Sequence, residues 1–238
     1  MLVCTVVLLA TGWALWHEAD TRQVIAHPAH HRAGSVPAAV PSTDQSASAE
    51  PVEDRSAQDW PVFAHVGELQ LILPNPGAKA VAYHQASYPD ALPLVPVGHL
   101  LKNYAGHLFH APQDTPGPRY IVQPQRTGRT TRATTAVDIV APDDMDIYAP
   151  VTGTVVKVKR YKLYGQYPDI EVEIKPDDQS GYRVVMIHLD DVAVQDGDHV
   201  SATLDPIGTP RVFPFHSVVN DYVGGGDPHV HLEVKAAP

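Results

Sequence analysis

The C-terminal end of the chain holds the residues best suited to chemistry, in the segment 227–234, which reads DPHVHLEV. Successive side chains of a β-strand point to opposite faces, so His229, His231 and Glu233 should share one face. The opposite face would then carry Val230, Leu232 and Val234. Imidazole is the commonest protein metal ligand and the usual proton carrier near neutral pH. The pattern therefore predicts a metal or proton-transfer site on a strand whose other face packs into a core; the alternative is a pair of surface histidines near a chain end.

Composition limits the classes of function that the 238-residue chain can have. A formal net charge of −10 argues against nucleic acid as a partner, because phosphate binding needs a basic face. The single cysteine, Cys4, excludes an intramolecular disulfide and a zinc site built on cysteines. The 14 histidines, set against 17 lysines and arginines, keep a histidine-based metal site open.

The N-terminal quarter of the chain predicts export rather than a folded domain. Residues 2–16 are apolar and uncharged, which is short for a spanning helix but fits an export signal or an uncleaved membrane anchor, taken as residues 1–16. Residues 17–59 are rich in Ala, Ser, Pro and acidic residues without periodicity, which predicts a disordered linker. We therefore expect an extracytoplasmic protein, secreted or anchored, that meets the membrane only through its first residues.

Residues 60–118 predict a small β-rich region without recognisable chemistry. Short strands are expected at 69–73 and 80–83, separated by the turn sequence Pro-Asn-Pro-Gly. A small subdomain and an extended lead-in that packs on the next domain both fit this pattern. Five histidines of this region are expected to be structural or surface residues rather than ligands: His65, His84, His99, His107 and His110.

Residues 119–238 show the clearest strand pattern. Apolar, β-branched segments alternate with Gly, Pro and Asp, and no amphipathic helix interrupts them. The expected strands lie at 137–142, 147–159, 170–175, 182–189 and 229–234. This spacing predicts a mostly β fold, an antiparallel sheet or sandwich, with the β-rich region as a small N-terminal extension.

Five segments of this C-terminal half, in order, resemble the lysostaphin-type (LytM-like) zinc metallopeptidases that cut peptidoglycan cross-bridges. They are AVDIVAP at 136–142, YAPVTGTV at 148–155, MIHL at 186–189, QDGDHV at 195–200 with IG at 207–208, and PHVHLEV at 228–234. The resemblance covers roughly residues 119–238. It implies an open antiparallel β-sheet core with a groove, of the duplicated hybrid motif type.

The resemblance also implies roles for four residues. Asp138 and His231 match zinc ligands of the family, and His188 and His229 match the two histidines that activate the water and steady the developing oxyanion. A catalytic zinc keeps three protein ligands and one open position, which suits such a set. Strand alternation would place His188 on the same face as Met186 and Val184, where it is the polar exception.

One position departs from the family pattern. The first zinc ligand of the family is a histidine four residues before the aspartate, and here that position is Thr134. A threonine hydroxyl is a poor zinc ligand compared with imidazole or carboxylate. Either the site has lost its metal, or a weaker site still turns over, or a replacement ligand comes from elsewhere, with His216 or Asp221 as candidates.

Three functions follow from these alternatives. The first is a zinc metalloendopeptidase that cleaves peptidoglycan peptides. The second is a catalytically inactive module of the same fold that binds peptidoglycan or regulates another wall hydrolase. The third is a structural β-domain of an envelope complex.

Overall fold

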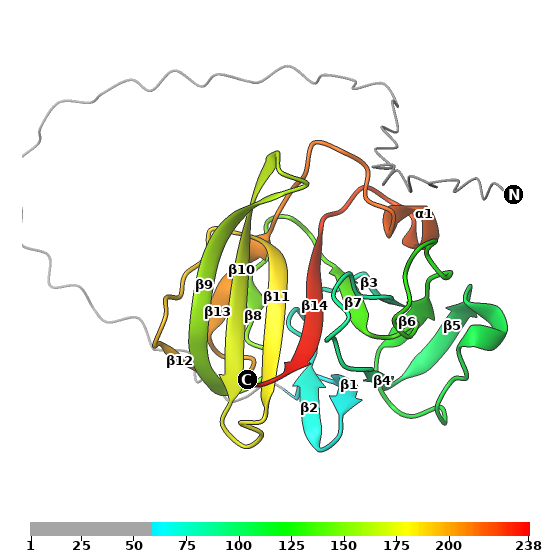
Figure 1. The fold of residues 1–238 in the computed structure, drawn as a ribbon, viewed down its shortest axis with the longest axis horizontal. Helices are drawn as coiled ribbons and strands as arrows, with labels where there is room; N and C mark the ends of the chain where they lie inside the picture. The colour runs from blue at the N-terminus through cyan, green and yellow to red at the C-terminus, as the bar shows by residue number, and fades with distance from the viewer. Residues whose placement is uncertain (1–58) are drawn as a thin grey trace, which may run out of the picture. The chain divides into compact units, whose positions relative to one another are not determined.

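The computed structural model describes residues 59–238, which form two β-sheets and very little helix (Figure 1). The predicted export signal and all but the last residue of the predicted linker lie outside these residues. Within residues 59–238, no helix has the length and apolar character needed to cross a bilayer.

The strands and helices follow one another in a simple order. They are β1 (Val62–Val66), β2 (Leu69–Ile72), β3 (Ala80–His84), β4 (Val95–Pro96), β5 (His99–Asn103), the 3-10 turn η1 (Gly106–Leu108), β6 (Arg119–Val122), β7 (Ala136–Val140), β8 (Ile147–Tyr148), β9 (Gly153–Leu163), β10 (Tyr167–Pro176), β11 (Tyr182–Asp190), β12 (His199–Val200), β13 (Pro206–Pro210), α1 (Asn220–Val223) and β14 (His229–Ala236). Each strand expected from the sequence is present, and the segment expected at 147–159 is divided between β8 and β9.

The large sheet has the order β12-β9-β10-β11-β14-β7-β3-β6-β5, with β13 and β8 branching from β11. From β12 to β3 the neighbouring strands are antiparallel, whereas β6 runs parallel to both β3 and β5. Parallel pairing needs long crossover connections, and residues 85–98 and 104–118 supply them. The prediction of a mostly β fold is confirmed, with a sheet that is mixed at one end.

Residues 60–118 contribute to both sheets. Strands β1, β2 and β4 form the small antiparallel sheet, while β3 and β5 enter the large one. In Figure 1, β3 lies beside β7, which in turn lies beside β14. The residues of β3 are therefore two strands away from the histidine-rich strand near the C-terminus.

Side-chain alternation divides β14 as the sequence predicts. Val230, Leu232 and Val234 are fully buried in the main hydrophobic cluster. His229, His231 and Glu233 line a pocket on the other face of the sheet. Because the apolar side chains of β14 are packed in the core, His229, His231 and Glu233 must point to the opposite face of the sheet.

Leu232→Ala should lower the free energy of unfolding by about 2–5 kcal/mol, because the lost contacts leave a cavity in a close-packed core. Urea titration followed by circular dichroism would measure the change. Val156→Ala on β9 is the control, since Val156 is 37% exposed and its truncation should cost less than about 1 kcal/mol. Equal losses in the two variants would contradict the assignment of Leu232 to the core.

Candidate metal centre and active site

Three buried side chains converge on one point between β3, β7 and β14. His84 Nε2 and His231 Nδ1 each lie 2.9 Å from the same oxygen, Asp138 Oδ1. The three ligand atoms lie within 4.8 Å of one another and could hold a metal ion. Tetrahedral zinc with ligand bonds near 2.1 Å would place its ligand atoms about 3.4 Å apart, somewhat farther than the 2.9 Å between Asp138 Oδ1 and each imidazole nitrogen.

Strand register explains why the three residues meet. His231 is the direct cross-strand partner of Asp138 on the β14–β7 pair. On the other side of β7, Asp138 faces Ala82, and His84 follows two residues later on the same face of β3. A cross-strand neighbour and a diagonal neighbour of Asp138 therefore provide the two imidazoles.

The hydrogen bonds on the far side of each imidazole fix its orientation. His84 Nδ1 donates to the backbone carbonyl of Gln85 at 2.9 Å, and His231 Nε2 lies 3.0 Å from Glu233 Oε1. A carbonyl oxygen can only accept, so the single proton of a neutral His84 is on Nδ1 and its Nε2 lone pair faces Asp138. A bound cation or a shared proton must bridge such facing acceptors. Histidine ligands of metal sites have this same outer hydrogen bond to a carbonyl or carboxylate.

Burial and mutual charge set the protonation of the cluster. Burial lowers the pKa of His84, against the opposing influence of Asp138. Burial alone would raise the pKa of Asp138, but the neighbouring His84 and His229 and the hydrogen bond from His231 hold it well below its ordinary value. Burial would lower the pKa of His231 too, but its hydrogen bonds to Asp138 and Glu233 raise it to about 9. Asp138 is thus ionised, as a metal ligand must be.

His188 lies beside this cluster on an irregular part of β11. Two residues of β11, Ile187 and His188, oppose one residue of β10 between the pairs Val172–Met186 and Ile170–Leu189. His188 has φ 66°, an uncommon conformation for a residue with a side chain. The bulge interrupts the alternation, so the expected placement of His188 on the face of Met186 and Val184 is wrong. Those two apolar residues are buried in the core, whereas His188 lines the pocket.

A buried carboxylate orients the His188 ring. His188 Nδ1 donates to Asp169 Oδ2 at 2.8 Å, and the Asp169 side chain is fully buried. The same carboxylate accepts hydrogen bonds from the Tyr161 hydroxyl and from the Ile170 backbone N–H. With Nδ1–H held in this way, the other ring nitrogen of a neutral His188 has a free lone pair.

His229 completes the group of histidines. Its ring centroid lies 5.1 Å from that of His188, and its Nε2 lies 3.8 Å from Asp138 Oδ1. Burial lowers the pKa of His229 to about 4, against the influence of Asp138. His229 is therefore neutral at pH 7 and can donate one ring N–H to an oxygen in the pocket.

The residues suggested as replacement ligands do not belong to the three-residue cluster, although His216 lines the same pocket. His216 and Asp221 are exposed and pair with each other at 2.9 Å. Thr134 is buried, its backbone carbonyl accepts from Leu94 N–H, and it lines a different pocket together with Arg132. The group that could hold a metal ion instead contains His84, which was expected from the sequence to be a structural or surface residue. Only the register of β3 on β7 links His84 to the site, and no local motif around His84 signals it.

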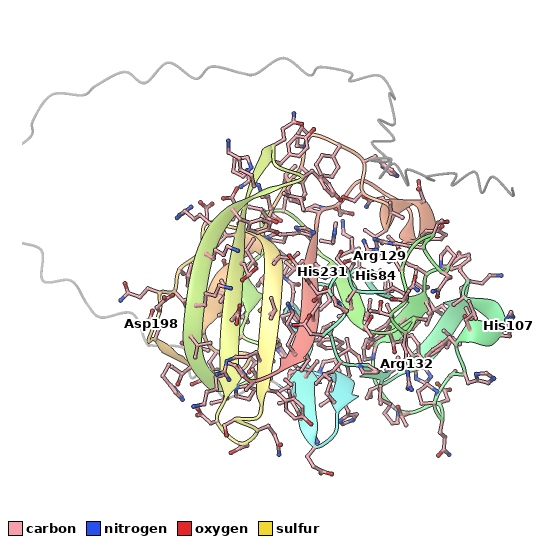
Figure 2. All side chains as sticks on the ribbon, viewed as in Figure 1. His84, His107, Arg129, Arg132, Asp198 and His231 are labelled. Carbon is pink, nitrogen blue, oxygen red and sulfur yellow. The ribbon has the colours of Figure 1, made fainter. Side chains whose placement is uncertain are left out.

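The pocket over the cluster has two chemically different ends. Near His188 it is aromatic, with Phe213 at 5.1 Å between ring centroids and Phe215 stacked on Phe213. Near His84 it is basic, with Arg126 and Arg129 in the wall. Figure 2 shows Arg129 next to His84 and His231, with Arg132 farther away.

Comparison with known proteins gives a family match for the same region. Residues 132–237 match the model of peptidase family M23. The chain matches no curated protein sequence.

Several solved structures are similar to part of the chain. The solution structure of lysostaphin is 22% identical with a TM-score of 0.33, over 43% of this chain and 36% of that chain. A zinc-containing peptidase from Vibrio cholerae is 24% identical with a TM-score of 0.31, over 46% of this chain and 29% of that one. A point mutant of the catalytic domain of the prophage-encoded M23 protein EnpA from Enterococcus faecalis is 23% identical with a TM-score of 0.32, over 48% and 76%. The chain thus spans well under half of the length of lysostaphin and of the Vibrio cholerae protein.

The family match includes Asp138 and His231 of the three-residue cluster, whereas His84 lies before the matched residues. Over residues 132–237, somewhat less than half of the chain, the sequence is therefore similar to peptidase family M23.

Proposed function

We propose that this protein is a zinc metalloendopeptidase that cleaves peptidoglycan peptides, and that His84, Asp138 and His231 hold the zinc. The observation that carries the proposal is the approach of His84 Nε2 and His231 Nδ1 to Asp138 Oδ1, at 2.9 Å each. Two imidazoles and one carboxylate are a ligand set of catalytic zinc sites that keep one position open. On this proposal His84 takes the place of the ligand that the sequence lacks at Thr134.

Zinc at this position would act as a Lewis acid on the scissile carbonyl and make a water molecule more acidic. His188 is then the general base, because Asp169 holds its Nδ1–H and leaves the other nitrogen free to take a proton. Asp169 acts through His188 as a positioning residue and keeps the imidazole in the productive tautomer.

His229 is proposed to stabilise negative charge on the carbonyl oxygen. It is neutral at pH 7, so one N–H can donate to an oxyanion while no proton needs to be removed first. Its ring meets that of His188 at 80°, so the two imidazoles can address different atoms of one substrate.

The proposal assigns a role to each part of the chain. Residues 1–16 would act as the export signal or anchor and 17–59 as a spacer, so that the activity is extracytoplasmic. Residues 60–118 would complete the metal site of the domain at 119–238, because β3 supplies His84. The partner is peptidoglycan or a wall peptide.

The alternative is a catalytically inactive module that binds peptidoglycan or regulates another wall hydrolase. Its main support was the threonine at position 134, which leaves two family ligands in place. His84 weakens that support, because it restores a third nitrogen or oxygen ligand next to Asp138 and His231.

The test is digestion of purified peptidoglycan by the full-length protein, with products identified by mass spectrometry. New amino termini are expected, lost after treatment with a chelator and restored by stoichiometric zinc. His231→Ala should be inactive. Retained zinc without any new amino terminus would exclude the peptidase and favour the binding module.

Glu233→Gln should lower zinc affinity by about tenfold, because the neutral amide is a weaker acceptor for His231 Nε2–H and makes the imidazole less basic. Competition with a fluorescent zinc chelator would measure the change. Glu173→Gln on β10, whose carboxylate pairs with Lys157 outside the pocket, is the matched control and should bind zinc as the wild type does. Equal affinities for all three proteins would show that Glu233 has no influence on the metal.

A further inference from the structure

Two arginines, Arg126 and Arg129, lie at the end of the pocket near His84 and have no acidic partner among the described residues. Within residues 59–238, no ion pair closer than 4.0 Å joins Arg126 or Arg129 to a carboxylate. Both are half-buried and line the pocket. The protein has a net charge of −10, yet two guanidinium groups without a paired carboxylate line this pocket.

Neutral groups hold the two side chains in place. Arg126 Nη2 donates to Gln123 Oε1 at 3.2 Å, and Arg129 Nη1 donates to Ser87 Oγ at 2.7 Å. The Arg126 Nε–H is buried and has no acceptor among the described residues. The guanidinium groups are therefore anchored, yet each keeps donors for a further partner.

These arginines lie close to the metal-binding cluster. Gln123, which accepts from Arg126, also reaches Asp138 Oδ2 at 3.5 Å through its Nε2. Arg129 also donates to the Gln85 carbonyl at 3.4 Å, the same carbonyl that accepts from His84. A group bound by both arginines would therefore lie in the same pocket as the three-residue cluster.

The charges of the pocket favour an anion. Asp138 and Glu233 are its two carboxylates, and Arg126 and Arg129 balance them. A divalent cation on His84, Asp138 and His231 would then leave an excess of two positive charges. Carboxylates are the anionic groups of a peptide, and guanidinium binds a carboxylate through paired, charge-assisted hydrogen bonds.

We propose that Arg126 and Arg129 form a carboxylate-binding subsite, so that the enzyme selects peptides with a free carboxylate next to the bond that it cuts. This inference rests on the proposed peptidase function and adds the substrate class. The carboxylate is either the C-terminus of the peptide or an acidic group within it.

The experiment measures binding of three forms of a fluorescent stem pentapeptide, Ala-γ-Glu-Lys-Ala-Ala, by anisotropy. One form has all carboxylates free, one is amidated at the C-terminus, and one is amidated at the γ-Glu α-carboxylate. The protein is the zinc-loaded full chain with His188→Ala, which keeps the peptide intact. The free peptide should bind at least about tenfold more tightly than one of the two amides, and that amide identifies the carboxylate.

The arginine variants decide whether the subsite is responsible. The combined Arg126→Gln and Arg129→Gln change should reduce the preference to less than about twofold, and Arg→Lys at both positions should keep part of it. Arg132→Gln is the matched control, on the same loop but in the wall of another pocket, and should keep the full preference. A circular dichroism melt of each variant verifies the fold.

Three results would overturn the subsite: no measurable binding of the free peptide at millimolar concentration, equal binding of all three forms, or a preference that survives loss of both arginines. The binding step does not depend on turnover. Cleavage by the wild type without a carboxylate preference would remove the subsite and leave the peptidase. A carboxylate preference in binding, without cleavage of peptidoglycan, would support the subsite and contradict the peptidase function.

Discussion

His84→Ala is expected to lower zinc affinity by at least about 100-fold and to abolish peptidoglycan cleavage. The change removes one of three ligand atoms and leaves the Asp138 carboxylate buried with one imidazole fewer to balance it. Zinc retained after dialysis against a mild chelator, measured by mass spectrometry of the metal, should fall from one per chain to nearly none.

His107→Ala is the control for this experiment. His107 comes from the same N-terminal half but is exposed at the outer side of the molecule, far from His84 in Figure 2. This variant should retain zinc and activity. If His84→Ala also kept one zinc per chain, the ligand would have to come from another residue and the role given to β3 would be wrong.

Asp169→Asn is expected to reduce kcat by about 100-fold or more while zinc content stays at one per chain. The amide can offer an N–H instead of an acceptor to His188 Nδ1, which favours the wrong tautomer and removes the charge that stabilises the protonated imidazole. Steady-state kinetics on a defined wall peptide, together with metal analysis, would measure both quantities.

Tyr161→Phe separates positioning from general damage around Asp169. It removes one of the three donors to the carboxylate and leaves the bond to His188 intact, so kcat should fall by less than about tenfold. A loss in Tyr161→Phe as large as that in Asp169→Asn would indicate a disturbed strand rather than a mispositioned base. Loss of zinc in Asp169→Asn would also indicate a disturbed strand.

Most of the strands could be predicted because each depends on the alternation of apolar and polar residues within a short segment. Alternating β-branched segments predicted β7, β9, β10, β11 and β14, and strand period predicted that His231 and Glu233 share a face opposite Leu232. Asp138 and His231 could be placed together through the resemblance, and the structure pairs them across β7 and β14. Their roles as ligands remain proposals.

The third member of the cluster could not be predicted in this way. His84 lies 54 residues before Asp138, and only the pairing of β3 with β7 brings the two together. Strand order is set by long-range packing, which leaves no mark near His84 itself. The bulge at His188 is similar, since a φ of 66° at a histidine depends on the register of the neighbouring strand.

The position of Arg126 and Arg129 in the pocket could not be predicted from the sequence either. Arg126 and Arg129 belong to the irregular segment between β6 and β7, where no periodicity tells which side chains face a pocket. Contacts to Gln85, Ser87 and Gln123 determine their direction, and these partners come from two separate parts of the chain.

The most direct test of the metal site is a crystal structure of the zinc-loaded protein with anomalous data collected at the zinc edge. We predict one peak within about 2.0–2.2 Å of His84 Nε2, an Asp138 carboxylate oxygen and His231 Nδ1. A peak bound by His216, Asp221 or Thr134 in place of His84, or no peak in protein that has one zinc per chain in solution, would contradict the account.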